Sequence, residues 1–125
     1  MQIILSIKPK YCEEIFSGTK RFEYRRRVFK QEIQKVLVYA TSPVCKIVGE
    51  FELERIIADT PDSIWNQTNQ YGGISRELYD QYFHGTDMAY ALAIAKYKRY
   101  KAPLDPKVLD SNFVAPQSYR YVNSE

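Results

Sequence analysis

Apolar residues recur along the chain either in short β-branched runs or at every second position, the two patterns typical of β-strands. These patterns predict strands over residues 3–7, 22–26, 36–40, 47–56, 88–97 and 118–122. Between them, apolar residues at helical spacing predict three short helices, which begin near Pro9, Thr60 and Ser75. Strands joined by short links with only local helices predict an α+β domain, built on a small curved sheet or β-barrel of five or six strands with flanking short helices.

The size and composition of the chain fit one domain that covers residues 1–125. The chain has 125 residues, of which 45% are hydrophobic and 26% charged, as in ordinary soluble proteins. No apolar run approaches the ~20 residues of a membrane span, and no basic region precedes the apolar start of the chain. We therefore expect a cytoplasmic protein with no membrane partner. Three of the six prolines follow residue 102, which predicts turns and extended chain before the last strand.

Few side chains that bind transition metals are present. The chain has one histidine, His84, and no Cys-x-x-Cys pair. We therefore expect no metal site and no cofactor. The two cysteines, Cys12 and Cys45, are expected to be free thiols, because a chain without a secretion signal rarely forms a structural disulfide.

Positive charge is concentrated in two segments of the chain. The formal net charge is only +3, but residues 20–30 hold six basic side chains and one acidic one, and residues 96–107 hold five and one. The rest of the chain is therefore acidic overall. Two basic segments on an acidic background predict a partner that carries phosphates, such as a nucleic acid.

Three charged residues are the main candidates for a site. Glu23 and Arg25 share one face of a predicted strand, and Lys20 lies near its start. A carboxylate among bases stays ionised and orients a lysine, while the Arg25 guanidinium offers a fork for phosphate. The alternative is a solvated strand face with surface ion pairs, each contributing about 0 to 1 kcal/mol.

Other residues are candidates for contacts with nucleic acid. Arg26 and Arg27 add sequence-independent electrostatic attraction beside Arg25, although the three cannot all point to one side of a strand. Lys8 precedes the first predicted helix, where ammonium groups and helix-end amides can meet a phosphate. Tyr97 and Tyr119 offer rings for base stacking, although most tyrosines in a small domain pack in the core. The remaining candidates, Gln117 and Ser118, can bond a base edge or their own turn.

Residues 18–25, with the sequence GTKRFEYR, contain a Gly-x-Lys-x-x-Glu-x-Arg element just after the first strand and helix. This element resembles the ASCH family, which belongs to the PUA-like β-barrels. The resemblance extends over most of the chain, through the segments IKPKYCEEIFSG, YATSPVCKIVGEFE, GIS and APQSYRYV. It implies a small barrel with a cleft between sheet and helices, lined by the polar face of the motif strand. The function that it implies is binding of RNA or of a nucleotide.

One branch of the family resembles amidohydrolases that act on 4-acetylcytidine. That branch has a lysine at the position of Lys20 but a threonine at the position of Glu23, so its catalytic arrangement does not transfer intact. Two hypotheses follow for the same basic cleft. The favoured one is a module that binds RNA, another single-stranded nucleic acid or a modified nucleoside. The alternative is a hydrolase, either 4-acetylcytidine amidohydrolase-like or a ribonuclease, with Lys20 as base or nucleophile and Glu23 orienting it.

Overall fold

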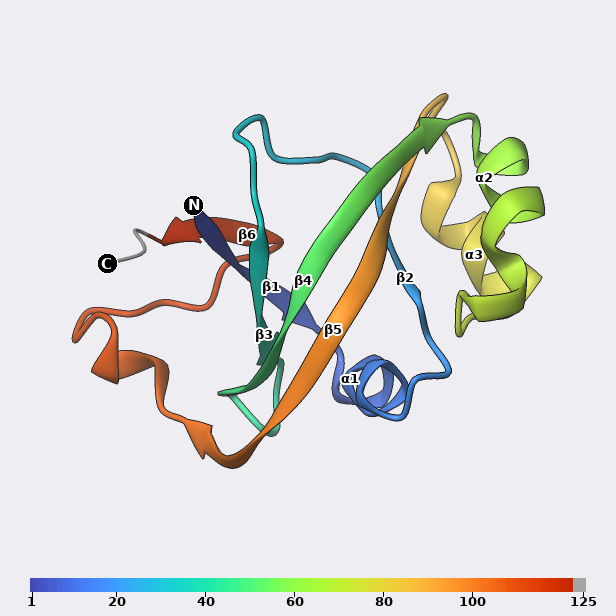
Figure 1. Ribbon diagram of the computed structural model, residues 1–125. Helices are drawn as coiled ribbons and strands as arrows, with labels where there is room; N and C mark the ends of the chain where they lie inside the picture. Colours follow the sequence, from blue (N-terminus) through green and yellow to red (C-terminus); the bar gives the residue numbers. More distant parts are fainter. Residues whose placement is uncertain (123–125) are drawn as a thin grey trace.

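The computed structural model describes residues 1–122, in which six β-strands pair into one curled sheet (Figure 1). The strands are β1 (Gln2–Ile7), β2 (Phe22–Arg25), β3 (Lys35–Ala40), β4 (Lys46–Asp59), β5 (Ala89–Leu104) and β6 (Tyr119–Val122). The helices are α1 (Pro9–Phe16), α2 (Pro61–Thr68) and α3 (Arg76–Phe83), with 3-10 turns η1 (Asn69–Tyr71) and η2 (Pro106–Val108). The strand order is β2-β5-β4-β3-β1-β6. Among the strand pairs of residues 1–122, β1 and β3 alone are parallel. The predicted α+β small barrel is confirmed.

Two long strands, β4 and β5, carry the curl of the sheet. Their pairing shifts register at three places between residues 47 and 55, and such irregularities bend strands and increase their twist. Gly49 lies in this stretch, and its lack of a side chain lets the Phe16 ring of α1 pack against the strand. The curl brings β2 close to β1, four places away in the strand order. Arg25 of β2 donates from Nη2 to the carbonyl oxygen of Ser6 at 2.8 Å.

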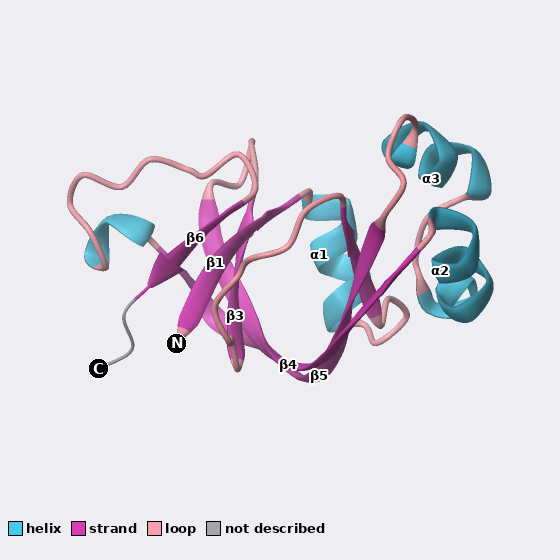
Figure 2. Ribbon diagram, turned by 90° about the horizontal axis from the view of Figure 1, so that it is seen from above, coloured by secondary structure: helices cyan, strands magenta, loops and turns pink. Residues whose placement is uncertain are grey.

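Two of the three apolar clusters among residues 1–122 lie on either side of the cleft between the sheet and its helices. One joins β1, β3 and α1 and includes Ile3, Ile15 and Val36. The other lies under α2 and α3 and includes Tyr24 of β2 and Tyr79 of α3. Figure 2 shows α2 and α3 gathered at one end of the sheet, with α1 between them and the β1, β3 and β6 strands. Strand β2 therefore contributes to the second cluster with one face and leaves its other face for the space near α1.

The predicted elements are all present, and the ends of some differ from the prediction. The Thr60 and Ser75 side chains accept hydrogen bonds from the backbone N–H groups of Ser63 and Leu78, as expected of residues that cap helices. Strand β5 continues seven residues past Tyr97, because its backbone pairs with β4 as far as Leu104. The expected turn region from residue 102 therefore begins later than predicted. Strand β2 ends at residue 25, one residue earlier than its pattern predicts.

Candidate functional site

A cavity of about 450 Å³ opens between β1, α1, β2 and α3. Its lining includes three charged residues predicted from the motif, Lys20, Glu23 and Arg25. Lys8 also lines it, at the point where β1 leads into α1. The cavity therefore lies where the curled sheet brings its β2 edge towards β1, and a third wall comes from α3, more than fifty residues further along the chain.

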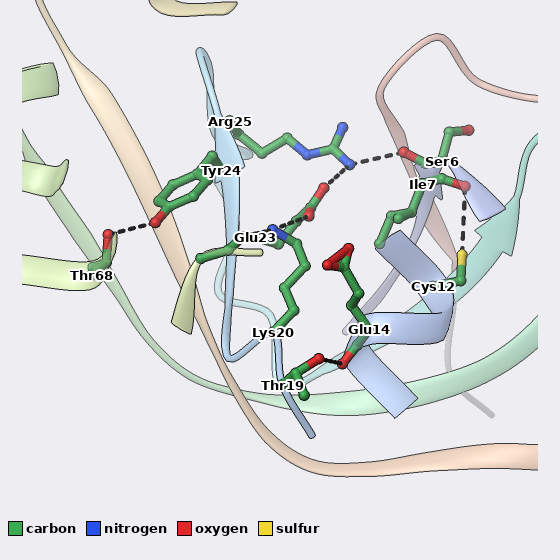
Figure 3. Close-up of polar contacts among 11 residues, drawn as sticks. Ser6, Ile7, Cys12, Glu14, Thr19, Lys20, Glu23, Tyr24, Arg25 and Thr68 are labelled. Carbon is green, nitrogen blue, oxygen red and sulfur yellow. Dashed lines mark hydrogen bonds and ion pairs between the residues drawn. The ribbon is translucent and has the colours of Figure 1, made fainter. Parts of the chain in front are cut away.

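The side chain of Lys20 is buried at the base of this cavity, and only 3% of it is exposed. Its Nζ donates a hydrogen bond to the carbonyl oxygen of Gly72 at 2.5 Å and lies 3.5 Å from Oε1 of Glu23 (Figure 3). The rings of Tyr11 and Tyr24 flank the ammonium group, with centroids 5.2 and 5.0 Å from Nζ. Burial lowers the pKa of Lys20, while the charge of Glu23 opposes that shift.

Two glycines and a helix set the position of Lys20. Gly18 ends the turn after α1 with a φ of +84°, a conformation that glycine adopts without strain. The backbone N–H of Lys20 then donates to the carbonyl oxygen of Glu14 in α1 at 3.0 Å. Gly73, with a φ of +69°, lies against the aliphatic part of the Lys20 side chain. A side chain at Gly73 would lie 3.2 Å from the Lys20 side chain, so glycine allows the loop after η1 to pack closely over the lysine.

Glu23 and Arg25 form a buried ion pair on the cavity side of β2. Oε2 of Glu23 accepts a hydrogen bond from Nη2 of Arg25 at 2.7 Å, and the two side chains are only 9% and 12% exposed. Arg25 also donates from Nη2 to the Ser6 carbonyl oxygen and from Nη1 to the Ser118 hydroxyl, at 2.8 and 3.3 Å. Arg25 therefore joins β2 to β1 and to the segment before β6, in addition to any role in binding. Its Nε is buried without a protein partner among residues 1–122.

Tyr24 connects the cavity to the α2–α3 end of the molecule. Its ring faces Lys20, and its hydroxyl lies 2.7 Å from Oγ1 of Thr68 in α2. The Thr68 hydroxyl donates its own hydrogen to the carbonyl oxygen of Ile64 at 2.6 Å. The Tyr24 hydroxyl must therefore be the donor to Thr68. Burial raises the pKa of Tyr24, which keeps this hydroxyl protonated.

The structure separates the other predicted contact residues into two groups. Lys8 lines the cavity, and Ser118 reaches it through Arg25. The remaining residues are not among those that line the cavity: Arg26, Arg27, Tyr97, Gln117 and Tyr119. Arg26 and Arg27 are exposed just beyond β2, Tyr97 is 46% exposed on β5, and Gln117 is exposed before β6. Tyr119 packs against Phe29, with ring centroids 5.6 Å apart. Roles in RNA binding for these residues stay predictions.

Sequence reasoning did not single out Ser6, Tyr11, Gln81 or Tyr82, all of which line the cavity. Of these, Tyr82 left a signal, because the apolar positions 78, 79, 82 and 83 of α3 cover a wider arc than one core contact needs. Tyr79 and Phe83 are buried, whereas the other two apolar positions face the cavity and remain partly exposed.

The structure also bears on the thiols, on metal binding and on membrane-spanning helices. Cys12 is buried and Cys45 exposed, and both are free, as predicted. Within residues 1–122, no group of three or more His, Cys, Asp or Glu side chains is placed to hold a metal ion. In the same part of the chain, no helix is both long and apolar enough to cross a membrane.

The fold and the site together define a small α+β barrel protein with a cavity in which a buried lysine, glutamate and arginine meet. The family model named ASCH domain matches residues 5–99, so this chain belongs to the ASCH domain family. That match includes the whole of the motif from Gly18 to Arg25 and the strands around it.

Three curated relatives are similar to this chain. The ATP synthase subunit alpha of Ureaplasma parvum serovar 3 is 34% identical over 121 residues, which cover 96% of this chain and 15% of that protein. The large ribosomal subunit protein uL22 of the same species is 36% identical over 104 residues, which cover 82% of this chain and 33% of that protein. The chain thus spans a third or less of these two relatives. An ASCH domain-containing ribonuclease of Zymomonas mobilis is 29% identical over 131 residues, which cover 99% of this chain and 86% of that protein.

The solved structures include a protein of the same fold. The crystal structure of ASCH from Zymomonas mobilis superposes with a TM-score of 0.91 and 28% sequence identity, covering 98% of this chain and 87% of that one. Two variants of that protein, with a tyrosine changed to phenylalanine and a serine changed to alanine, superpose with the same TM-score.

Proposed function

We propose that this protein binds single-stranded RNA and takes one unpaired nucleotide into the cavity between β1, β2 and α3. The convergence of Lys20, Glu23 and Arg25 in one concave site carries this proposal. A volume of about 450 Å³ is within the range of pockets that hold small ligands. A nucleotide inside a base-paired duplex does not reach such a site unless it leaves the stack, so unpaired RNA is the expected ligand.

Charge near the cavity supports an RNA partner. Lys8 lines the cavity, and Arg26 and Arg27 follow β2 on the exposed surface. Ammonium and guanidinium groups around a cavity attract the phosphates on either side of an inserted nucleotide. The relative of similar length from Zymomonas mobilis is named a ribonuclease, and RNA is the substrate of that class of enzyme.

The test of binding compares two lysines that are two residues apart. Fluorescence anisotropy with an unstructured RNA is measured at several salt concentrations for the parent, Lys8→Gln and Lys10→Gln. Lys8 lines the cavity and Lys10 does not, and both are solvent-exposed. We expect Lys8→Gln to weaken binding and to reduce the salt slope by about one counterion, with a clearly smaller effect for Lys10→Gln. Binding that ignores salt, or equal losses in both variants, would refute RNA binding at this cavity.

A second candidate function is cleavage of the bound RNA, which the environment of Lys20 favours. A base removes the proton of a ribose 2′-hydroxyl, the 2′-oxygen attacks the adjacent phosphorus, and the departing 5′-oxygen receives a proton. Nζ of Lys20 already contacts Gly72 and Glu23, and a neutral amine can give its two hydrogens to these oxygens and keep its lone pair for the substrate. The pKa of Lys20, lowered by burial, increases the neutral fraction that this role needs.

Turnover separates binding from catalysis. The parent, Lys20→Met and Glu23→Gln proteins are compared on an unstructured RNA and on 4-acetylcytidine, after circular dichroism has verified the fold of each. If Lys20 is the base, Lys20→Met loses about a hundredfold or more in rate, and the parent rate rises with pH until Lys20 is neutral. Near-parental activity of Lys20→Met would exclude this mechanism. RNA binding without turnover by the parent would select the binding module, and turnover of 4-acetylcytidine alone would select the amidohydrolase.

A further inference from the structure

Helix α3 presents two large side chains to solvent at the mouth of the cavity. Leu78 is 46% exposed and Tyr82 is 38% exposed, and both line the cavity. They are four residues apart, so they lie on one face of α3, while Tyr79 and Phe83 on the adjacent face are buried. Of the adjacent aromatic residues Tyr82 and Phe83, the Phe83 ring therefore lies in the core and the Tyr82 ring at the edge of the cavity. An exposed aromatic ring at the edge of a cavity is a surface on which a planar group can stack.

The Tyr82 ring is supported by its neighbour in α3. It packs edge to face against the buried ring of Phe83, with centroids 4.8 Å apart. Burial raises the pKa of the Tyr82 hydroxyl, while the charge of Arg25 and the backbone of Arg26 lower it. One edge of the ring is therefore packed while part of the side chain remains accessible, so a ligand would order little of it on binding.

The surface continues beyond the cavity across α3. A second, more open hollow is lined by Asp80, Gln81 and His84, and Gln81 also lines the cavity. The Asp80 carboxylate pairs with the Arg76 guanidinium at 3.0 Å, so its negative charge is balanced by a neighbouring positive charge. Arg26 is exposed directly after the end of β2. A nucleic acid strand that leaves the cavity over α3 therefore meets the aromatic ring of Tyr82 and the side-chain amide of Gln81.

We propose that the α3 rim, formed by Leu78, Gln81 and Tyr82, binds the base next to the nucleotide in the cavity, with Tyr82 as its stacking platform. This inference rests on the proposed RNA binding and adds a second subsite to it. Base stacking on an aromatic side chain is tolerant of sequence, so the rim favours RNA of at least two nucleotides without selecting a particular base there. The ribose and phosphate between the two bases then lie beside Arg25 and Arg26.

The α3 rim is tested by comparing the affinities of a one-nucleotide and a two-nucleotide ligand in four proteins. Affinities for a ribonucleoside monophosphate and for the matching dinucleotide are measured by competition against a labelled RNA, and chromatography verifies that each ligand stays intact. The proteins are the parent, Tyr82→Ala, Tyr82→Phe and Tyr71→Ala. Tyr71 is a matched control, because it is 40% exposed on η1 and lines neither hollow. Tyr82→Phe keeps the ring and removes only the hydroxyl.

We expect the parent to bind the dinucleotide about fivefold or more tightly than the monophosphate, the lower end of what one stacked base contributes. Tyr82→Ala should lose that advantage, while Tyr82→Phe and Tyr71→Ala keep it. Equal losses for both ligands in Tyr82→Ala, or no effect on either, would overturn the second subsite while leaving RNA binding at the cavity intact. No binding of any RNA by the parent would instead refute the proposed function itself. Concentration-dependent association that disappears in Tyr82→Ala, without a change in RNA affinity, would assign this face to a second copy of the chain and also overturn the proposal.

Discussion

The hydrogen bond from Tyr24 to Thr68 should show strong energetic coupling, because one hydroxyl depends entirely on the other. Tyr24→Phe removes the donor and leaves Thr68 bonded to the carbonyl oxygen of Ile64. We expect it to cost about 1 kcal/mol of the free energy of unfolding, the net value of a typical hydrogen bond. Thr68→Val leaves the Tyr24 hydroxyl without its acceptor in a residue that is only 6% exposed. That change should cost about 2 kcal/mol, because a buried donor without a partner bears its full desolvation penalty.

The double variant distinguishes this reasoning from simple additivity. With both partners replaced by apolar groups of nearly the same shape, the combined cost should be about 1 kcal/mol, well below the sum of about 3 kcal/mol for independent sites. Urea unfolding of the four proteins gives the free energies, and thermal midpoints should fall by about 4 °C for each 1 kcal/mol. If the cost of the double variant equals the sum of the two single costs within about 0.5 kcal/mol, water replaces Thr68 as the acceptor and the buried hydrogen bond is refuted. RNA affinity should be unchanged in Tyr24→Phe, since the ring beside Lys20 remains.

Three further predictions concern the loop over Lys20, the charge of Lys20 and the cysteines. Gly73→Ala and Gly85→Ala should each lose about 1 to 2 kcal/mol of stability, because both glycines have a positive φ. Only Gly73→Ala should also weaken RNA binding, since a Cβ at position 73 meets Lys20, whereas one at position 85 meets no atom within 4 Å. Binding measured beside urea unfolding distinguishes them, and equal binding in both would contradict the contact. Burial lowers the pKa of Lys20 below its usual 10.5. Between the lowered pKa and 10.5 the unfolded chain therefore binds more protons than the folded protein, so the free energy of unfolding of the parent should rise with pH relative to that of Lys20→Met. A difference between the two proteins that does not change with pH would argue against burial of Lys20. Burial raises the pKa of Cys12 to about 12, so a thiol reagent near pH 7 should titrate only Cys45 in the folded protein and both thiols after denaturation.

Local rules account for the parts of the structure that the sequence predicted well. The two-residue period of a strand placed Glu23 and Arg25 on one side of β2, and in the structure both side chains line the cavity and pair with each other. Thr60 and Ser75 marked the starts of α2 and α3, because their side chains accept backbone hydrogen bonds within one helical turn. These features depend on residues within a few positions of each other, which is why a single sequence carries them.

The ends of strands were less predictable from the sequence, because the length of a strand depends on the strand with which it pairs. The pattern of β5 loses its apolar alternation after Tyr97, yet the backbone continues to pair with β4 as far as Leu104. Leu78 and Tyr82 show the same limit in a helix. Their spacing indicated a helix, and only the position of α3 in the fold shows that these two side chains border the cavity.

By itself, the sequence determined the order and type of the elements, the charged face of β2 and the residue types that meet at Lys20. The tertiary structure alone decided what those groups contact. The carbonyl oxygen that accepts from Lys20 belongs to Gly72, 52 residues away, and the hydroxyl that accepts from Arg25 belongs to Ser118, 93 residues away. The Lys20 contact forms where the loop after η1 folds back, with the Tyr71 carbonyl oxygen accepting from the backbone N–H of Arg21. The Arg25 contact forms where the irregular pairing of β4 and β5 curls the sheet until β2 approaches β1 and the segment before β6. Curvature of that kind is a property of paired strands and not of any one of them, so no local pattern in the chain records it.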